Sequence, residues 1–236
     1  MTELLPSERV ILAIDTFDFQ EADRLASIAK EAGARYVKFG LELSSATSWH
    51  SCADLAADNG LDWVADAKLH DIPNTIAGAV KNFARFDHPP FGITVHASSG
   101  IEAMSAAQEQ SDTIKMLGVT ILTSIDKDIL RIYKAAPRVK ILEFADDIAK
   151  AGLNGIVASP REVRMLRNYY ATAGMLMMVP GIRSEGQSTH DQLRVGTPAE
   201  VIRGGADLLV VGRQITQAED PFLEFQRVVT EIESAA

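Results

Sequence analysis

Eight short apolar segments alternate with amphipathic helical segments along this chain, and this alternation restricts the fold more than any other feature. Each apolar segment is nearly continuous, which is typical of parallel strands that are buried on both faces. These segments lie at 10–15, 36–40, 64–68, 92–96, within 115–124, and at 155–159, 175–179 and 207–212. Helical spacing of apolar residues is found at 17–33, 41–59, 74–86, 100–110, 141–151, 160–173, 197–204 and 221–234, and is less clear at 125–140.

Eight repeats of a strand followed by a helix predict either a closed (β/α)8 TIM barrel or an open doubly wound sheet. The chain has 236 residues, close to the ~250 residues that are typical of the barrel. No GxGxxG motif follows the first strand, which argues against the dinucleotide-binding form of the open sheet. Because no linker or low-complexity stretch interrupts the chain, we predict a single (β/α)8 barrel domain over 1–236.

Composition and charge argue against several classes of protein. The formal net charge of −9 does not fit a broad nucleic-acid surface, which needs clustered basic residues. No apolar run is long enough to cross a membrane, and residues 1–9 lack the apolar stretch of a signal peptide. Cys52 is the only cysteine, so an internal disulfide is impossible, and we expect it to be a buried helix residue. We therefore expect a cytoplasmic protein with no nucleic-acid partner and no membrane contact.

The segment DWVADAKLHDIPNT at 62–75 places three ionisable residues, Asp66, Lys68 and Asp71, within six positions. If 64–68 is a strand, Asp66 and Lys68 point to the same face, because side chains alternate along a strand. Opposite charges on the inward face of a strand are costly to bury unless a site uses them. The alternative is a structural ion pair at the end of the strand.

In a (β/α)8 barrel the working face is formed by the carboxyl ends of the strands. Nearly every predicted strand places a polar or charged residue there, namely Asp15, Lys38, Asp66, Lys68, Asp71, His96, Thr123, Ser159, Arg183 and Arg213. The loops after strands seven and eight of such barrels often bind phosphate, and both carry a glycine near an arginine. Such a glycine lets a ligand approach the backbone closely. His96 is more often a structural histidine than a catalyst, so we assign it no role.

Together these segments resemble the orotidine 5′-phosphate decarboxylase family, especially its bacterial branch. The central match is DAKLHDIP at 66–73, followed by Thr75. Supporting matches, in the right order along nearly the whole chain, are AID at 13–15, VKFG at 37–40, LTS at 122–124, VPGIR at 179–183, DQ at 191–192 and VVGR at 210–213.

The resemblance implies a (β/α)8 homodimer that converts orotidine 5′-phosphate to UMP and CO2 without a cofactor, as the last step of de novo pyrimidine nucleotide synthesis. It implies that Lys68 donates a proton to C6 of the pyrimidine and that Asp66 lies against the departing carboxylate. Asp71 and Thr75 are expected to extend across the dimer into the neighbouring site.

The same resemblance assigns the rest of the substrate. It implies that Asp15 and Lys38 hold the ribose hydroxyls, and that Thr123, with Ser124 nearby, lies beside the pyrimidine. The residues expected to bind the phosphate are Arg183, Gln192, Gly212 and Arg213, with the segment 181–196 closing over it as a lid.

Two other functions stay open. A related barrel lyase that acts on sugar phosphates through a metal-held enediolate shares a similar Asp-x-Lys-x-x-Asp array. Asp66 and Asp71 are two candidate metal ligands, but Lys68 between them competes for the same space, so we expect no metal. The third candidate is a non-catalytic barrel that binds a phosphorylated ligand.

Overall fold

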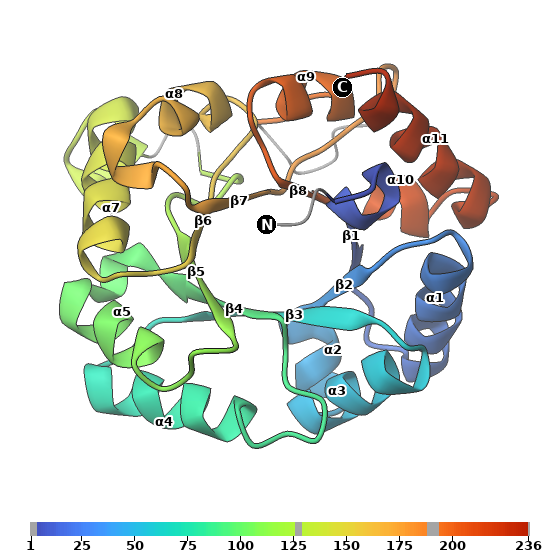
Figure 1. The fold of residues 1–236 in the computed structure, drawn as a ribbon, viewed down its shortest axis with the longest axis horizontal. Helices are drawn as coiled ribbons and strands as arrows, with labels where there is room; N and C mark the ends of the chain where they lie inside the picture. Colours follow the sequence, from blue (N-terminus) through green and yellow to red (C-terminus); the bar gives the residue numbers. More distant parts are fainter. Residues whose placement is uncertain (1–3, 126–128, 188–193, 236) are drawn as a thin grey trace.

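The computed structural model describes residues 4–125, 129–187 and 194–235. Eight parallel strands close into a barrel in sequence order, with the last strand paired to the first, which confirms the predicted (β/α)8 fold (Figure 1). The strands are β1 (Val10–Ile14), β2 (Tyr36–Phe39), β3 (Asp62–Leu69), β4 (Gly92–His96), β5 (Lys115–Val119), β6 (Gly155–Val157), β7 (Leu176–Val179) and β8 (Leu208–Val211).

Helices surround the barrel and connect successive strands (Figure 1). They are α1 (Phe19–Glu31), α2 (Leu41–Ala46), α3 (Trp49–Asp58), α4 (Pro73–Phe83), α5 (Ile101–Gln108), α6 (Ile129–Tyr133), α7 (Pro137–Lys150), α8 (Val163–Arg167), α9 (Pro198–Arg203), α10 (Arg213–Thr216) and α11 (Pro221–Glu233), with the short 3-10 helices η1 (Pro6–Arg9), η2 (Ala97–Ser99) and η3 (Tyr170–Thr172). Proline occupies the first position of the α-helices α4, α7, α9 and α11 and of the 3-10 helix η1, where its missing N–H costs no hydrogen bond. In the part of the chain that the structure describes, no helix combines the length and the apolar character that a membrane crossing requires.

Three helical regions differ from the prediction. The segment 160–173, predicted as one helix, contains the short helix α8 and the separate 3-10 helix η3. The segment 41–59, predicted as one helix, is divided into α2 and α3. The Ser48 hydroxyl accepts a hydrogen bond from the N–H of Ser51 and caps α3, while the Thr47 hydroxyl donates to the carbonyl of Leu43. Such side chains compete with the helical backbone for hydrogen bonds, so the pair ends one helix and starts the next. In the region 125–140, where the helical spacing is less clear, Pro137 begins α7.

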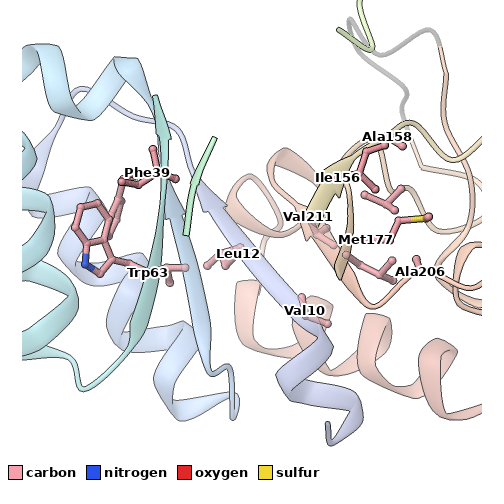
Figure 2. Close-up of a cluster of buried hydrophobic side chains, with 14 of the residues drawn as sticks. Val10, Leu12, Phe39, Trp63, Ile156, Ala158, Met177, Ala206 and Val211 are labelled. Carbon is pink, nitrogen blue, oxygen red and sulfur yellow. The ribbon is translucent and has the colours of Figure 1, made fainter. Parts of the chain in front are cut away.

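Strand side chains alternate between a helix-facing surface and the barrel interior. Val10 and Leu12 belong to the outer cluster, together with Phe39 and Trp63 on one side of Figure 2 and Met177 on the other. The same cluster contains Cys52, which is fully buried in α3 as expected, and burial raises the pKa of its thiol to about 12. The interior cluster is Ile11, Ala13, Tyr36, Val64, Leu117, Val119, Val157, Met178, Leu208 and Val210.

The interior changes from apolar to charged along the barrel axis. In β2 the inward residue Tyr36 is followed two positions later by Lys38, and in β3 the inward residue Val64 is followed by Asp66. Because side chains two positions apart on a strand share a face, both charges lie above the apolar filling, toward the carboxyl ends of the strands. The apolar layer of the barrel interior therefore lies directly beneath the charged residues and forms the bottom of the site.

Close packing between β5 and α7 gives a test of this arrangement. A Cβ at Gly118 would lie 2.5 Å from Cγ1 of the buried Ile148, so Gly118→Ala should lower the free energy of unfolding by about 1–3 kcal/mol in urea titrations. The control is Gly78→Ala within α4, where a Cβ meets nothing within 4 Å and helix propensity should raise stability by about 0.5–1 kcal/mol. Equal stability of the two variants would contradict the packing described here.

Candidate active site

A cavity of about 630 Å³ opens at the carboxyl ends of the barrel strands. Its wall contains eight of the residues predicted from the sequence as site residues: Asp15, Lys38, Asp66, Lys68, Thr123, Arg183, Gly212 and Arg213. These residues come from the ends of β1, β2, β3, β7 and β8 and from the segment after β5. The barrel therefore brings together, at one mouth, side chains that are far apart in the sequence.

Four of these side chains form an array in which positive and negative charges alternate. The Lys38 ammonium lies 3.1 Å from Oδ1 of Asp15 and 3.1 Å from Oδ2 of Asp66. The Lys68 ammonium lies 2.8 Å from the same Oδ2 of Asp66. Carboxylates and ammonium groups therefore alternate in the order Asp15–Lys38–Asp66–Lys68. The formal charges of these four side chains sum to zero.

The two inner side chains of this charge array are buried, while the two outer ones are partly exposed to solvent. The side chains of Lys38 and Asp66 are 9% and 13% exposed, against 49% for Asp15 and 40% for Lys68. Burial alone would lower the pKa of Lys38, but the carboxylates of Asp66 and Asp15 outweigh it and raise that pKa. Burial alone would raise the pKa of Asp66, but Lys38 and Lys68 hold it well below its usual range. Both buried groups are thus charged because each has the other beside it.

A bulge in β3 sets the direction of the Lys68 side chain. Ala65 pairs with Ile93 of β4, and the next pair is Leu69 with Val95, so the register shifts between these two pairs. Lys68 lies within the shift and has a φ of 44°, in the left-handed region that a residue with a side chain rarely adopts. Backbone strain of this kind is typical of functional sites, where surrounding contacts maintain it.

Thr94 of β4 lies beside the bulge, and no sequence pattern selected it as a site residue. Its hydroxyl accepts a hydrogen bond from the N–H of Lys68 at 2.8 Å and donates to Oδ1 of Asp66 at 2.9 Å. The residue is completely buried. The only available signal was a polar residue between the apolar Ile93 and Val95, which is also what an ordinary buried threonine looks like.

Arginines supply a second, cationic part of the cavity. Arg183 follows β7 and is buried, and its Nη1 donates to the carbonyl of Ile182 at 2.6 Å. Burial and the charge of Arg213 both lower the pKa of Arg183, so the two guanidinium groups lie within electrostatic reach of each other. Gly181 has a φ of 82°, a conformation that suits glycine. An anionic group bound between these arginines would be stabilised by both.

The two ends of the segment 181–196, which is predicted as a lid, are hydrogen-bonded to each other. The N–H of Arg183 donates to the carbonyl of Gly196 at 3.0 Å, and the N–H of Gly196 donates to the carbonyl of Gly181 at 3.3 Å. Gln192 and the other residues at 188–193 lie outside the described residues, so the predicted phosphate contact of Gln192 and the lid itself stay predictions.

Arg194, at the end of this segment, forms a buried ion pair that the sequence did not indicate. Its Nη1 lies 2.6 Å from Oε1 of Glu162, and Nη2 donates to the carbonyls of Ile121 and Leu122 at 2.9 and 2.8 Å. Arg194 is 3% exposed and Glu162 is 7% exposed. The guanidinium thus attaches the segment after β7 to the backbone that immediately precedes Thr123.

Two predicted site residues do not line the cavity of this chain. Asp71 and Thr75 are exposed, and Oδ1 of Asp71 accepts a hydrogen bond from the N–H of Ile72 at 2.7 Å. Their predicted contribution to a neighbouring chain's site stays a prediction. Among residues 4–125, 129–187 and 194–235, no group of three or more His, Cys, Asp or Glu side chains is placed to hold a metal ion.

His96, to which we assigned no role, lies beside the site rather than in the wall of the cavity. Its Nδ1 accepts a hydrogen bond from the N–H of Ser98 at 3.2 Å and lies 2.7 Å from the Ser98 hydroxyl. Burial, together with the nearby His70 and Lys68, lowers the pKa of His96 to about 4. His96 is therefore neutral at pH 7, with Nδ1 free of a proton.

Comparison with known proteins identifies the family of this chain. Residues 8–228 match the model of the family described as "Orotidine 5′-phosphate decarboxylase / HUMPS family". The chain belongs to this family. The match includes every site residue that we predicted, and it extends from η1 to α11.

Individual relatives cover nearly the whole chain. A protein of Anaeromyxobacter sp. (strain K), named orotidine 5′-phosphate decarboxylase, is 40% identical over 220 residues, which are 92% of this chain and 94% of that protein. A protein of the same name from Bradyrhizobium sp. is 36% identical over 236 residues, which are 99% of this chain and 95% of that protein. The crystal structure of orotidine 5′-phosphate decarboxylase from Lactobacillus acidophilus superposes with a TM-score of 0.80 at 28% identity and covers 95% of this chain and 99% of that chain.

The buried pair of Lys38 and Asp66 makes a prediction about stability. Asp66→Asn leaves the Lys38 ammonium buried with the half-exposed Asp15 as its one remaining carboxylate partner among the described residues, so the free energy of unfolding should fall by about 3 kcal/mol. Asp15→Asn leaves Asp66 in place and should cost less than about 1 kcal/mol, since Asp15 is partly in solvent. Urea titration at pH 7 measures both, and a smaller loss for Asp66→Asn than for Asp15→Asn would contradict the assignment.

Proposed function

We propose that this protein decarboxylates orotidine 5′-phosphate to UMP and CO2, the last step of de novo pyrimidine nucleotide synthesis, and that it uses no cofactor. The observation that carries the proposal is the array of alternating charges Asp15–Lys38–Asp66–Lys68 in the wall of a cavity that is also lined by Arg183 and Arg213. The names of the relatives at 40% and 36% identity support the same substrate.

The cationic part of the cavity suits the phosphate of this substrate. Arg183 and Arg213 supply two positive charges, and the glycine backbone at 212 lines the same wall. Forked guanidinium groups bind phosphate oxygens in pairs, which fixes orientation as well as charge. Gln192 would complete this grip. Binding free energy from the phosphate would hold the pyrimidine in place and lower the barrier at a distant carbon.

The charge array is expected to contact the ribose and the reacting pyrimidine of the substrate. Asp15 and Lys38 would hold the ribose hydroxyls, and Thr123 would lie beside the pyrimidine. Asp66 would lie against the carboxylate that departs. Because Lys38 and Lys68 keep Asp66 ionised, its negative charge is present at neutral pH.

Lys68 would carry the chemistry. Breaking the bond between C6 and the carboxylate releases CO2 and leaves the electron pair on C6. The Lys68 ammonium would stabilise this charge in a site shielded from water, where such interactions are strongest. It would then transfer one proton to C6, giving UMP and a neutral amine that is reprotonated from solvent. The atoms and electrons balance without a metal, an oxidant or a reductant.

We also propose a cytoplasmic homodimer in which Asp71 and Thr75 of each chain complete the site of the other. Both residues are exposed outside the cavity of their own chain, next to the start of α4. Ile72, which follows Asp71, is 65% exposed, as expected for an apolar residue that a partner would cover.

The role of Lys68 is tested by substitution. Lys68→Ala should lower kcat for orotidine 5′-phosphate by at least about a thousandfold, because both the stabilising charge and the proton donor are lost. The control is Lys81→Ala on the exposed surface of α4, which should keep parental activity. Turnover is followed by the change in pyrimidine absorbance, and circular dichroism shows that the variant is folded. A kcat within tenfold of the parent would refute the role of Lys68.

The same assay separates the decarboxylase from the metal-dependent lyase, the second candidate that the Asp-x-Lys-x-x-Asp array at 66–71 leaves open. Turnover should be unchanged in EDTA. Loss of activity in EDTA that a divalent metal restores would favour the metal-dependent reaction. Binding of UMP without release of CO2 from orotidine 5′-phosphate would favour the non-catalytic barrel.

Sharing of sites across a dimer is tested by mixing two inactive variants. In a heterodimer of Lys68→Ala and Asp71→Ala chains, one site carries both changes and the other carries neither. After subunit exchange, activity should therefore recover to about a quarter of the parental value, the fraction of native sites in a random mixture. Each variant treated alone is the control. No recovery, or a monomer in sedimentation at micromolar concentration, would rule out the shared site.

A further inference from the structure

The bulge in β3 leaves the backbone between Ala65 and Leu69 outside the regular ladder with β4. Asp66 and Lys68 both lie in this interval, and Thr94 is the β4 residue between their flanking partners Ile93 and Val95. A backbone N–H that leaves a ladder inside a protein needs another acceptor. The position of Lys68 in the cavity therefore depends on whatever replaces the missing ladder contacts.

The Thr94 hydroxyl supplies one such replacement, the acceptor for the N–H of Lys68. A hydroxyl has one proton to donate, and an ionised carboxylate can only accept, so the Thr94 proton goes to Oδ1 of Asp66. The same oxygen then accepts the N–H of Lys68. One atom thus contacts the side chain of Asp66 and the backbone of Lys68, and it does so in a completely buried position.

These contacts divide the Asp66 carboxylate between two functions. Oδ2 faces the ammonium groups of Lys38 and Lys68, and Oδ1 is held by Thr94. Without the hydroxyl, Oδ1 loses this donor and the carboxylate can rotate about its terminal bond. The left-handed backbone of Lys68 also loses the acceptor of its N–H, and such conformations persist only when neighbouring contacts hold them.

We propose that Thr94 is a positioning residue that fixes the Asp66 carboxylate and the Lys68 backbone together, and thereby sets the place of the Lys68 ammonium in the cavity. Thr94 is absent from the cavity wall, so it acts through Asp66 and Lys68 and not on the substrate. A site that must stabilise charge at one carbon tolerates little displacement of the stabilising group. The effect of Thr94 should therefore appear in kcat more than in binding. Its kinetic test rests on the proposed decarboxylase function.

The kinetic experiment compares three variants. Thr94→Val keeps the shape and removes the hydroxyl, and it should lower kcat by about 10- to 100-fold with KM changed less than about threefold. Thr94→Ser restores the hydroxyl and should recover kcat to within about fivefold of the parent. Thr120→Val is the matched control, because Thr120 is 1% exposed but its hydroxyl donates to the carbonyl of Val157 at 3.0 Å instead of to a charged site residue.

A purely structural role would give a different pattern. If buried threonine hydroxyls matter only for stability, Thr94→Val and Thr120→Val should lower the melting temperature similarly and both keep kcat within about threefold. That result, or a Thr94→Ser variant as slow as Thr94→Val, would overturn the proposal. If Thr94→Val is too unstable to assay, normal kcat in Thr94→Ser supports the hydroxyl and a kcat as low as that of Lys68→Ala refutes it.

A second measurement does not depend on the reaction. The Thr94 hydroxyl accepts the Lys68 N–H, so hydrogen exchange at this amide should accelerate at least about tenfold in Thr94→Val and stay near parental in Thr94→Ser and Thr120→Val. Unchanged exchange in Thr94→Val would refute the proposal even if kcat falls. If the parent does not decarboxylate orotidine 5′-phosphate, the proposed function fails, and the exchange experiment still decides the role of Thr94.

Discussion

The structure of this site depends on one buried ion pair, Lys38 with Asp66. Each charge, taken into the barrel interior alone, would be destabilising by several kcal/mol. Together, and extended by Asp15 and Lys68, they form a neutral array in which the two inner charges are buried and the two outer ones meet solvent. The ionisation of Lys38 and Asp66 is therefore a property of the assembled barrel, since neither pKa would be shifted in the same direction by burial alone.

The barrel makes this array possible by separating apolar and charged layers along its axis. Tyr36 and Val64 fill the interior below, and Lys38 and Asp66 follow them on the same faces of the same strands. The bulge at 66–68 then turns β3 out of its ladder and directs Lys68 into the cavity. A regular strand would supply the alternation, but it would not supply the left-handed backbone at Lys68.

Two connections that lie outside the reacting groups hold the cavity in shape. Thr94 joins β4 to the bulge in β3. Arg194, in the segment after β7, forms an ion pair with Glu162 and donates to the backbone carbonyls just before Thr123. It thereby connects the segment that carries Arg183 to the segment that carries Thr123. Both connections link segments that are distant in the sequence, 26 residues apart for Lys68 and Thr94 and 73 residues apart for Ile121 and Arg194.

The sequence by itself determined the fold, because eight apolar strands with helical segments between them have few ways to bury both faces of a parallel sheet. It also indicated Asp15, Lys38, Asp66, Lys68, Thr123, Arg183 and Arg213, because charged or polar residues at the ends of apolar strands stand out in a local pattern. Thr94, Glu162 and Arg194 carry no such local signal, since a threonine inside a strand and an arginine in a polar loop are ordinary residues. Only the tertiary structure decided their roles, because a hydrogen bond or ion pair between segments distant in the sequence exists only once the fold has brought those segments to within about 3 Å.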